Sequence, residues 1–299
     1  MLSPLDAVRA VRDVRRSAGK QREAEEFCAD MARREAKNFY WGFISLPRDR
    51  RMAIYALYDF ARQVDDDVDG APNAALVPDR LLAQRRRITR CVHGQSEDPV
   101  MHVLSRAVRR FQIPESELQA LIEGVERDLG THRYETWDAL REYCTLVASV
   151  VGRMCVRIFG FEDPRALQYA DDLGIALQLT NILRDVREDA QMGRIYVPRE
   201  DLERFGVREA TLMDGIPGPG WEQLIAFETR RARLHFDSGY EVLQYIPRRA
   251  AACVQTMAGI YERILEKIEQ DPWLPLRTRA TLSNREKLHV VLSSWLRPA

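Results

Sequence analysis

The most informative segment of this chain reads Gln178–Leu179–Thr180–Asn181–Ile182–Leu183–Arg184–Asp185–Val186–Arg187–Glu188–Asp189. On an α-helix, residues four apart lie above one another on the same face. Asn181, Asp185 and Asp189 therefore form one polar column, and Gln178 stands a turn before it. The flanking positions are mostly apolar, so we expect this helix, from about residue 164 to residue 189, to be largely buried. Unpaired charges inside a protein are costly, and the column therefore needs a partner.

A second acidic column lies upstream. Asp65 and Asp69 are again four apart, Arg62 is one turn before Asp65, and Tyr58 is two turns before it. Two such columns repel each other by about 4 kcal/mol per pair of charges at about 4 Å. Divalent cations between them would turn this repulsion into attraction, and ligands that are oxygens only indicate Mg²⁺ rather than Zn²⁺. A single acidic run is as readily a solvated face, but two columns of equal spacing favour a metal and a diphosphate.

Composition sets the broad class. The 299 residues include 45 Lys plus Arg and 45 Asp plus Glu, so net charge gives no reason to expect a nucleic acid partner. Five scattered cysteines without a C-x-x-C pair indicate a reducing compartment. The N-terminal residues are charged rather than signal-like, and no apolar stretch is long enough to span a bilayer. We expect a soluble, cytoplasmic protein.

Almost every segment of the chain has a helical pattern. Residues 48 to 68 predict a long central helix. Residues 22 to 38 predict a further helix, for which Phe27, Met31 and Phe39 are the candidate inward contacts. Residues 137 to 160 predict a helix whose small Ala148, Ser149 and Gly152 allow a close approach or a kink. No strand alternation is sustained, and residues 215 to 220 are interpreted as a surface loop. The prediction is one all-α domain over residues 1–299.

An apolar helical bundle with two acidic helices suits a hydrophobic diphosphate ester. Metal ions assist departure of the diphosphate as Lewis acids, and the allylic carbocation left behind needs a dry, aromatic pocket. The candidates to stabilise that cation are Tyr58, Tyr143, Phe39 and Tyr40, each of which is alternatively a core residue. The candidates to grip the diphosphate are Arg62, Arg184 and Arg194. Arg184 and Arg194 are alternatively ordinary surface cations.

At these motifs the chain resembles the squalene/phytoene synthase family, the head-to-head trans-prenyltransferases. The resemblance runs from about Phe39 to Arg285. Residues 55–69 are similar to the family's first aspartate-rich motif. Residues 177–189, followed by Gly193–Arg194–Ile195–Tyr196–Val197–Pro198, are similar to the second motif, which is long and specific.

The resemblance implies a single-domain class I isoprenoid synthase bundle that binds two allylic prenyl diphosphates in a central cavity. One substrate ionises with Mg²⁺ assistance, and its C1 is captured by the C2=C3 double bond of the other to give a cyclopropylcarbinyl diphosphate. The implied Mg²⁺ ligands are Asp65, Asp69, Asp185 and Asp189, with Asn181 assisting. The implied diphosphate contacts are Arg62, Tyr58, Gln178 and Arg184. Tyr143 and Tyr261 are implied to line the ionisation site.

A short segment, residues 147–153, bears on the chain length of the prenyl substrate. Residues 147–153 are more similar to presqualene diphosphate synthases of the hopanoid pathway than to phytoene synthases, which usually carry Ala-Gly-Thr-Val-Gly there. This favours condensation of two farnesyl diphosphates (C15) to presqualene diphosphate, and in some family members onward to squalene. The alternative is a phytoene synthase that condenses two geranylgeranyl diphosphates (C20). The chain has no Gly-rich dinucleotide fingerprint, but enzymes of this family that reduce to squalene use NADPH without one.

Three further alternatives bear on function. A non-catalytic helical scaffold should have lost aspartates from a column, and this chain keeps both. A head-to-tail prenyltransferase would carry D-D-x-x-D in both positions, and the Asn181/Asp185/Asp189 column argues against it. The segment Lys287–Leu292 with Trp295 could lie at the inner face of a membrane, although a terminal helix of the bundle is the simpler interpretation.

Overall fold

The computed structural model describes residues 4–36, 40–70, 73–96, 98–130, 133–216 and 218–296. Throughout these residues the secondary structure is helical, apart from an isolated parallel bridge between Arg133 and Ile195. The all-α class is therefore confirmed. Two compact units are resolved: unit 1 is Met1–Tyr40 with Pro47–Glu115, and unit 2 is Trp41–Leu46 with Ser116–Ala299. Each is described by itself, and the single-domain organisation stays a prediction.

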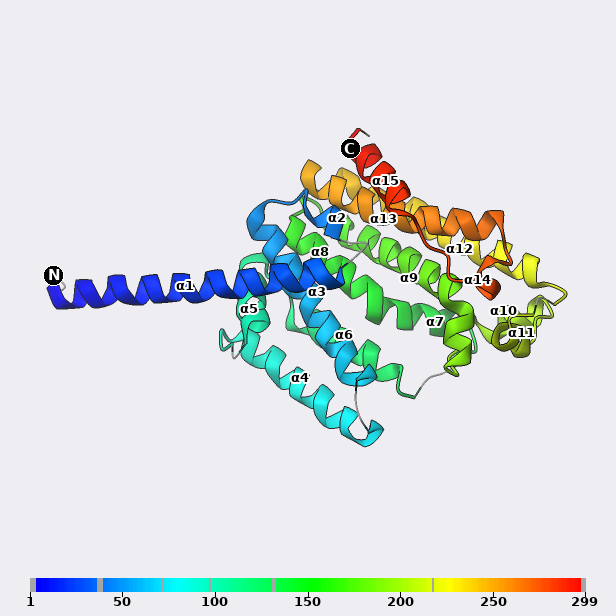
Figure 1. The fold of residues 1–299 in the computed structure, drawn as a ribbon, viewed down its shortest axis with the longest axis horizontal. Helices are drawn as coiled ribbons and strands as arrows, with labels where there is room; N and C mark the ends of the chain where they lie inside the picture. The colour runs from blue at the N-terminus through cyan, green and yellow to red at the C-terminus, as the bar shows by residue number, and fades with distance from the viewer. Residues whose placement is uncertain are drawn as a thin grey trace. The chain divides into compact units, whose positions relative to one another are not determined.

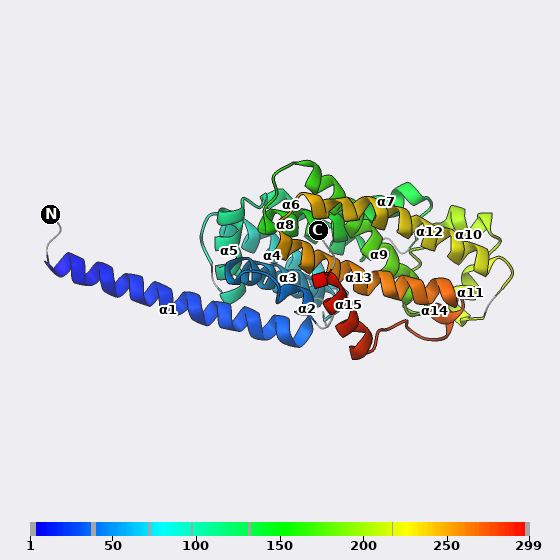
Figure 2. The same ribbon diagram turned by 90° about the horizontal axis from the view of Figure 1, so that it is seen from above.

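Unit 1 is built around α3. Its elements are α1 (Pro4–Glu35), α3 (Arg48–Asp69), the 3₁₀ turn η1 (Ala74–Leu76), α4 (Val77–Val92) and α5 (Pro99–Phe111). Residues 52–57 of α3 are all buried, so this helix is apolar around its circumference, as a central helix should be. Helices α1, α4 and α5 all contact it (Figures 1 and 2). The predicted central position of residues 48 to 68 is confirmed.

One expectation for α1 is wrong. Phe27 is 42% exposed rather than turned inward. The buried stripe of α1 consists of Ala24, Cys28 and Ala32, which are spaced four apart. Because these side chains are small, α1 packs closely on its neighbours with this stripe, and Phe27 falls on the adjoining face.

Unit 2 holds the remaining helices. After α2 (Tyr40–Phe43), whose last three residues belong to this unit, come α6 (Glu115–Arg127), α7 (Trp137–Cys144), the π-helical turn η2 (Thr145–Ser149), α8 (Val150–Phe159), α9 (Arg165–Gln191), α10 (Arg199–Arg204), α11 (Glu209–Asp214), α12 (Trp221–Tyr240), the 3₁₀ turn η3 (Glu241–Gln244), α13 (Arg248–Gln270), α14 (Leu274–Arg277) and α15 (Asn284–Leu296). Helix α9 is the centre of this unit, because α8, α12, α13 and α14 all contact it.

Two glycines let the backbones around α9 come close together. A Cβ on Gly174 would lie 2.8 Å from the Ser149 backbone of η2, and a Cβ on Gly239 of α12 would lie 2.7 Å from Leu173. The predicted helix over residues 137 to 160 is therefore interrupted by a π turn at the point where α9 touches it. The close approach that the small residues there predicted is confirmed, and π turns are common at functional sites.

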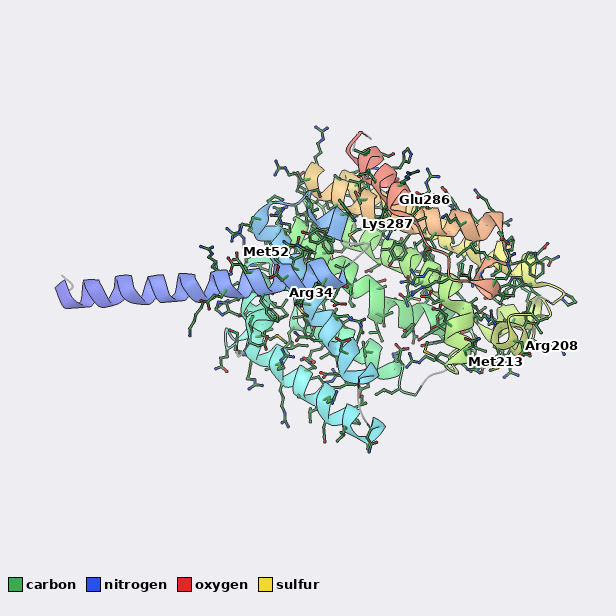
Figure 3. The ribbon with its side chains drawn as sticks, viewed as in Figure 1. Arg34, Met52, Arg208, Met213, Glu286 and Lys287 are labelled. Carbon is green, nitrogen blue, oxygen red and sulfur yellow. The ribbon has the colours of Figure 1, made fainter. Side chains whose placement is uncertain are left out.

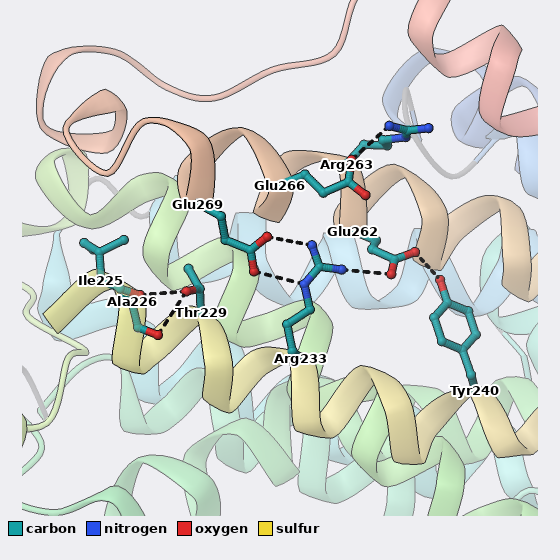
Figure 4. Close-up of polar contacts among 9 residues, drawn as sticks. All are labelled: Ile225, Ala226, Thr229, Arg233, Tyr240, Glu262, Arg263, Glu266 and Glu269. Atoms are coloured by element: carbon teal, nitrogen blue, oxygen red, sulfur yellow. Dashed lines mark hydrogen bonds and ion pairs between the residues drawn. The ribbon is translucent and has the colours of Figure 1, made fainter. Parts of the chain in front are cut away.

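Charged pairs fasten the first half of α9 to its neighbours. Arg153 of α8 donates to Asp171 at 2.5 and 2.6 Å, and Ser238 of α12 donates to Asp172 at 2.6 Å. Figure 4 shows that ion pairs also join α12 to α13, where Arg233 of α12 pairs with Glu262 and Glu269 of α13. These contacts leave the second half of α9, which carries the polar column, to form a site.

Candidate active site

The first acidic column lies on α3 in unit 1. Tyr58, Arg62, Asp65 and Asp69 follow one face of that helix. Arg62 pairs with Asp66 one turn further on, at 3.0 Å. Burial raises the pKa of Tyr58 to about 12, with Arg62 opposing and Asp65 adding to the rise, so these three groups are close enough to interact. The side chain of Asp69 and the whole of Phe39 lie outside the described residues.

The second column lies on α9 in unit 2, and Asn181 is its most unusual member. Its side-chain nitrogen donates to Gln178 Oε1 at 3.4 Å and is also hydrogen-bonded to the Tyr261 hydroxyl. Its carbonyl oxygen Oδ1 is buried and accepts no hydrogen bond from the described residues. A buried acceptor left without a donor costs about 1–3 kcal/mol, so this oxygen is suited to an electropositive ligand such as a cation.

Two arginines hold Asp185, one turn beyond Asn181. Arg184 approaches both carboxylate oxygens, at 2.8 and 2.6 Å, and Arg279 approaches the same two at 2.8 and 3.0 Å. Burial lowers the pKa of Arg184, but its pair with Asp185 outweighs this and the net pKa is raised. The Arg184 side chain is only 11% exposed, so Arg184 is not an ordinary surface cation, and its contact with diphosphate stays a prediction.

Asp189 ends the column. Burial, followed by the charge of Asp185, raises the pKa of Asp189 to about 7, against the opposing charge of Arg194. Arg194 is brought there by the backbone, because its N–H donates to the Asp189 carbonyl at 2.8 Å. Arg194 is thus close enough to Asp189 to act on its charge, as expected for a member of this site.

Tyr143 belongs to a cluster of three tyrosines. Its ring centroid lies 5.4 Å from both Tyr134 and Tyr196, and the Tyr143 and Tyr196 hydroxyls donate to the two oxygens of Asp128 at 2.9 and 3.0 Å. Burial and the charge of Asp128 raise the pKa of both tyrosines, so their hydroxyls stay protonated and act as donors. The cluster forms a rigid aromatic wall directly before the π turn.

Several functional candidates escaped the sequence interpretation. Arg279 follows α14, a four-residue helix that carries no strong pattern, and its contact with Asp185 spans 94 residues. Asp128 lies just after α6 and has no motif around it. Tyr196 sits inside the quoted segment 193–198, and that position was the one available signal.

Within the ranges that the structure describes, no group of three or more His, Cys, Asp or Glu side chains is arranged to hold a metal ion. The α9 column supplies two carboxylates and one amide oxygen, while the other predicted ligands, Asp65 and Asp69, belong to unit 1. Over the same ranges no helix has the length and apolarity needed to cross a bilayer.

Comparison with known proteins assigns the chain. The squalene/phytoene synthase family model matches residues 32–286. A phytoene synthase from Mycobacterium tuberculosis is 36% identical over 278 residues, which are 91% of this chain and 90% of that protein. The crystal structure of squalene synthase HpnC from Alicyclobacillus acidocaldarius has a TM-score of 0.79 at 32% identity, covering 85% of this chain and 96% of that one. A dehydrosqualene synthase has a TM-score of 0.85 at 28% identity, covering 92% and 96%.

These matches span both motifs and nearly the whole helical chain. The family supports head-to-head condensation of prenyl diphosphates, and its members are prenyltransferases. The chain is a prenyltransferase of the squalene/phytoene synthase family, with the helical fold of the isoprenoid synthases.

Proposed function

We propose that this protein condenses two farnesyl diphosphates to presqualene diphosphate. In this reaction C1 of one substrate forms a cyclopropane ring with C2 and C3 of the other, and one diphosphate and one proton are released. The observation that carries the proposal is the α9 column, where the buried and unpartnered Asn181 Oδ1 lies one turn from the doubly held Asp185. Such a column is suited to a metal–diphosphate complex.

Mg²⁺ fits the residues present. Asn181 offers a carbonyl oxygen that lacks a donor, Asp185 and Asp189 offer carboxylates, and oxygen ligands of this kind are those that Mg²⁺ prefers. We include Asp65 and Asp69 from the first motif in the ligand set. When bound, the metal would supply Lewis-acid assistance to departure of the diphosphate.

The chain's own cations would hold and orient the diphosphate. Arg184 and Arg279 share Asp185, so a ligand that takes over this carboxylate frees their donor forks for phosphate oxygens. Arg62, Arg194, Tyr58 and Gln178 complete the proposed contacts. The arginines carry positive charge, and Tyr58 and Gln178 can donate hydrogen bonds. Together they stabilise the negative charge that develops on the leaving diphosphate.

Aromatic groups would protect the reacting carbon atoms. Tyr143 is rigidly held by Asp128, and Tyr261 is buried beside Arg184 and Asn181. We propose that both line the ionisation site, together with Phe39. Their faces can stabilise a cation, and their bulk excludes the water that would quench it.

The relatives support two chain lengths. The squalene synthase neighbour at 32% identity supports C15 farnesyl substrates, while the phytoene synthase relative at 36% identity supports C20 geranylgeranyl diphosphate as the second candidate. We retain farnesyl diphosphate because residues 147–153, which overlap the end of the π turn, carry the presqualene-type sequence. NADPH belongs to the proposal only if the product is squalene.

Helix α15 is the proposed membrane contact. Leu288 and Leu292 are four apart, and they are 52% and 56% exposed. The helix is held to α13 from its other side, where Ser294 bonds Thr256 at 2.7 Å. Because substrate and product are greasy, we propose that this exposed pair rests on the membrane surface.

Product analysis tests the reaction. Purified protein is incubated with Mg²⁺ and either farnesyl or geranylgeranyl diphosphate, with and without NADPH, and product masses are read by chromatography. A C30 diphosphate from farnesyl diphosphate is expected, and Asp185→Asn should abolish it while Asp138→Asn, a surface change on α7, should not. A C40 product from the longer substrate alone would replace farnesyl by geranylgeranyl diphosphate. No product from either substrate would contradict the proposal.

A further inference from the structure

Unit 1 contains a cleft that no part of the proposed reaction uses. Its volume is about 710 Å³, within the usual range of small-molecule sites, and it lies among α1, α3 and α5. Met52, labelled in Figure 3, marks its α3 side. Met52 precedes Asp65 by 13 residues, which is about 20 Å along the helix axis. The cleft is therefore well separated from Asp65, the first proposed metal ligand on α3.

The floor of the cleft is apolar. Met52 and Ala53 come from α3, and Val103 and Ala107 come from α5; each is less than a tenth exposed. Phe111 closes one end, with the Arg110 guanidinium 5.5 Å from its ring centroid. A floor of this kind has no donors for a free inorganic ion, but it suits a hydrocarbon chain.

The rim of the cleft carries more arginines than carboxylates. Arg48 pairs with Glu25 at 2.9 Å, and Arg110 pairs with Asp49 at 2.5 Å. Arg106 and Arg109 also line the cleft and are exposed, and neither has a carboxylate partner among the described residues. Two cationic forks thus stand beside an apolar floor with no anion to neutralise them.

Two neighbouring groups also bear on what the cleft can bind. Burial lowers the pKa of His102, and the charges of Arg106, Lys20 and Arg109 lower it further, so the local potential is positive. Gln21 of α1 donates to Glu25 at 2.6 Å, but its own carbonyl oxygen is buried and has no donor among the described residues. That oxygen would accept from a hydroxyl on a bound head group.

We infer that this cleft is a second ligand site, which binds an anionic amphiphile with a phosphate head between Arg106 and Arg109 and an apolar chain along the floor. The guanidinium forks match phosphate oxygens, and a protonated phosphate or a glycerol hydroxyl meets Gln21. The head belongs either to a membrane phospholipid or to a free prenyl or alkyl phosphate, since both share this chemistry.

Titration with dodecyl phosphate, below its micelle concentration, tests the site. The full chain is first saturated with Mg²⁺ and farnesyl thiodiphosphate, so that the reaction site is filled. One further equivalent of dodecyl phosphate should bind by calorimetry, at least tenfold more tightly than inorganic phosphate. The double variant Arg106→Gln with Arg109→Gln should weaken this binding at least tenfold, since both residues are exposed and the fold should tolerate the change.

A matched control separates the cleft from general charge. Arg34→Gln with Arg86→Gln removes the same charge from exposed positions of unit 1 outside the cleft, and it should bind dodecyl phosphate as the unmodified protein does. Equal weakening in both double variants would overturn the proposal. So would failure of dodecyl phosphate to bind once the thiodiphosphate fills the reaction site, or equal affinity for inorganic phosphate.

Vesicles identify the source of the head group. Co-sedimentation with phosphatidylglycerol–phosphatidylcholine vesicles is compared with phosphatidylcholine alone, using Leu288→Ser with Leu292→Ser to remove any contribution from α15. Loss of sedimentation in the Arg106/Arg109 double variant supports a phospholipid head. Unchanged sedimentation, combined with weakened dodecyl phosphate binding, supports a free amphiphile. If the double variant changes neither measurement, the cleft is not a ligand site.

Discussion

Arg279 Nε lies 2.8 Å from Asp185 Oδ1, although 94 residues separate the two in sequence. A neighbouring contact supports this pair, because Arg187 of α9 donates to the Leu276 carbonyl at 2.9 Å and holds α14 on α9. The segment that follows α14 is thereby laid along the acidic column. Asp185 is consequently occupied by two guanidinium groups before any ligand arrives.

Arg279 should compete with Mg²⁺ for Asp185. Its side chain is 47% exposed, so the pair contributes about 1 kcal/mol at most. Arg279→Gln should therefore tighten Mg²⁺ binding up to about fivefold in the absence of substrate, as measured by calorimetry. Arg277→Gln, which removes the cation that pairs with Asp271, is the control. Unchanged or weaker Mg²⁺ binding in Arg279→Gln would contradict this competition.

Tyr143→Phe should impair turnover more than folding. The change removes one of the two tyrosine donors to Asp128 and leaves the aromatic ring in place. Since Asp128 keeps the Tyr196 donor, we expect only about 1 kcal/mol of folding stability to be lost. We expect a kcat at least tenfold lower. Tyr196→Phe removes the other donor and serves as the comparison. Full activity in Tyr143→Phe would exclude its hydroxyl from the ionisation site.

Asp59 should make unit 1 less stable as pH rises. This carboxyl is 1% exposed, and neither of its oxygens has a hydrogen-bond partner among the described residues. Burial, opposed by the nearby Cys28 thiol, raises its pKa from 3.8 to about 7. The folded state keeps the proton up to about pH 7, whereas the unfolded chain releases it near pH 4. The contribution of Asp59 to the free energy of unfolding therefore falls between about pH 4 and pH 7 and stays low above that range.

Asp59→Asn tests this pH dependence. The variant should be more stable than the unmodified protein by about 1–3 kcal/mol at pH 8 and nearly equal to it at pH 5, when urea unfolding is compared at both values. Asp30→Asn, an exposed change on α1, should keep the original slope. Identical slopes for Asp59→Asn and the unmodified protein would show that Asp59 does not titrate in this range.

Gly174→Ala should destabilise unit 2. The added Cβ would meet the Ser149 backbone at 2.8 Å, and backbone atoms cannot yield as the end of a side chain can. Overpacking of this kind costs about 1–3 kcal/mol, so a lower melting temperature is expected. Gly130→Ala is the matched control, because nothing lies within 4 Å of the Cβ it would add. Equal melting temperatures for the two variants would mean that η2 can move away from α9.

The parts of the fold with a sustained periodic pattern were predictable. Helix α9 was expected over residues 164 to 189 and runs from Arg165 to Gln191, because its apolar and polar positions repeat over seven turns. The central place of α3 followed from its unbroken apolar run. Phe27 was misplaced, because periodicity gives a stripe but does not say that Ala24, Cys28 and Ala32 would be preferred over an aromatic residue for close packing.

The site was predictable only where chemistry and spacing coincide on one helix. Asn181, Asp185 and Asp189 could be read as a column, whereas Arg279 and Asp128 reach the site through tertiary contacts that no local pattern records. The orphaned Asn181 Oδ1 is a property of packing, and so is the raised pKa of Asp189. Such features depend on what surrounds a residue and not on its neighbours in sequence.

The long separation of Asp185 and Arg279 also sets an order of events during synthesis. At about 5–20 residues per second, the 94 residues between them take on the order of 5–20 s to translate. For that time the nascent chain carries Asp185 without its second guanidinium, and α9 without the segment that Arg187 holds. We therefore expect the nascent chain to pass through a stage in which its acidic column is open to cations, until the segment that carries Arg279 is translated.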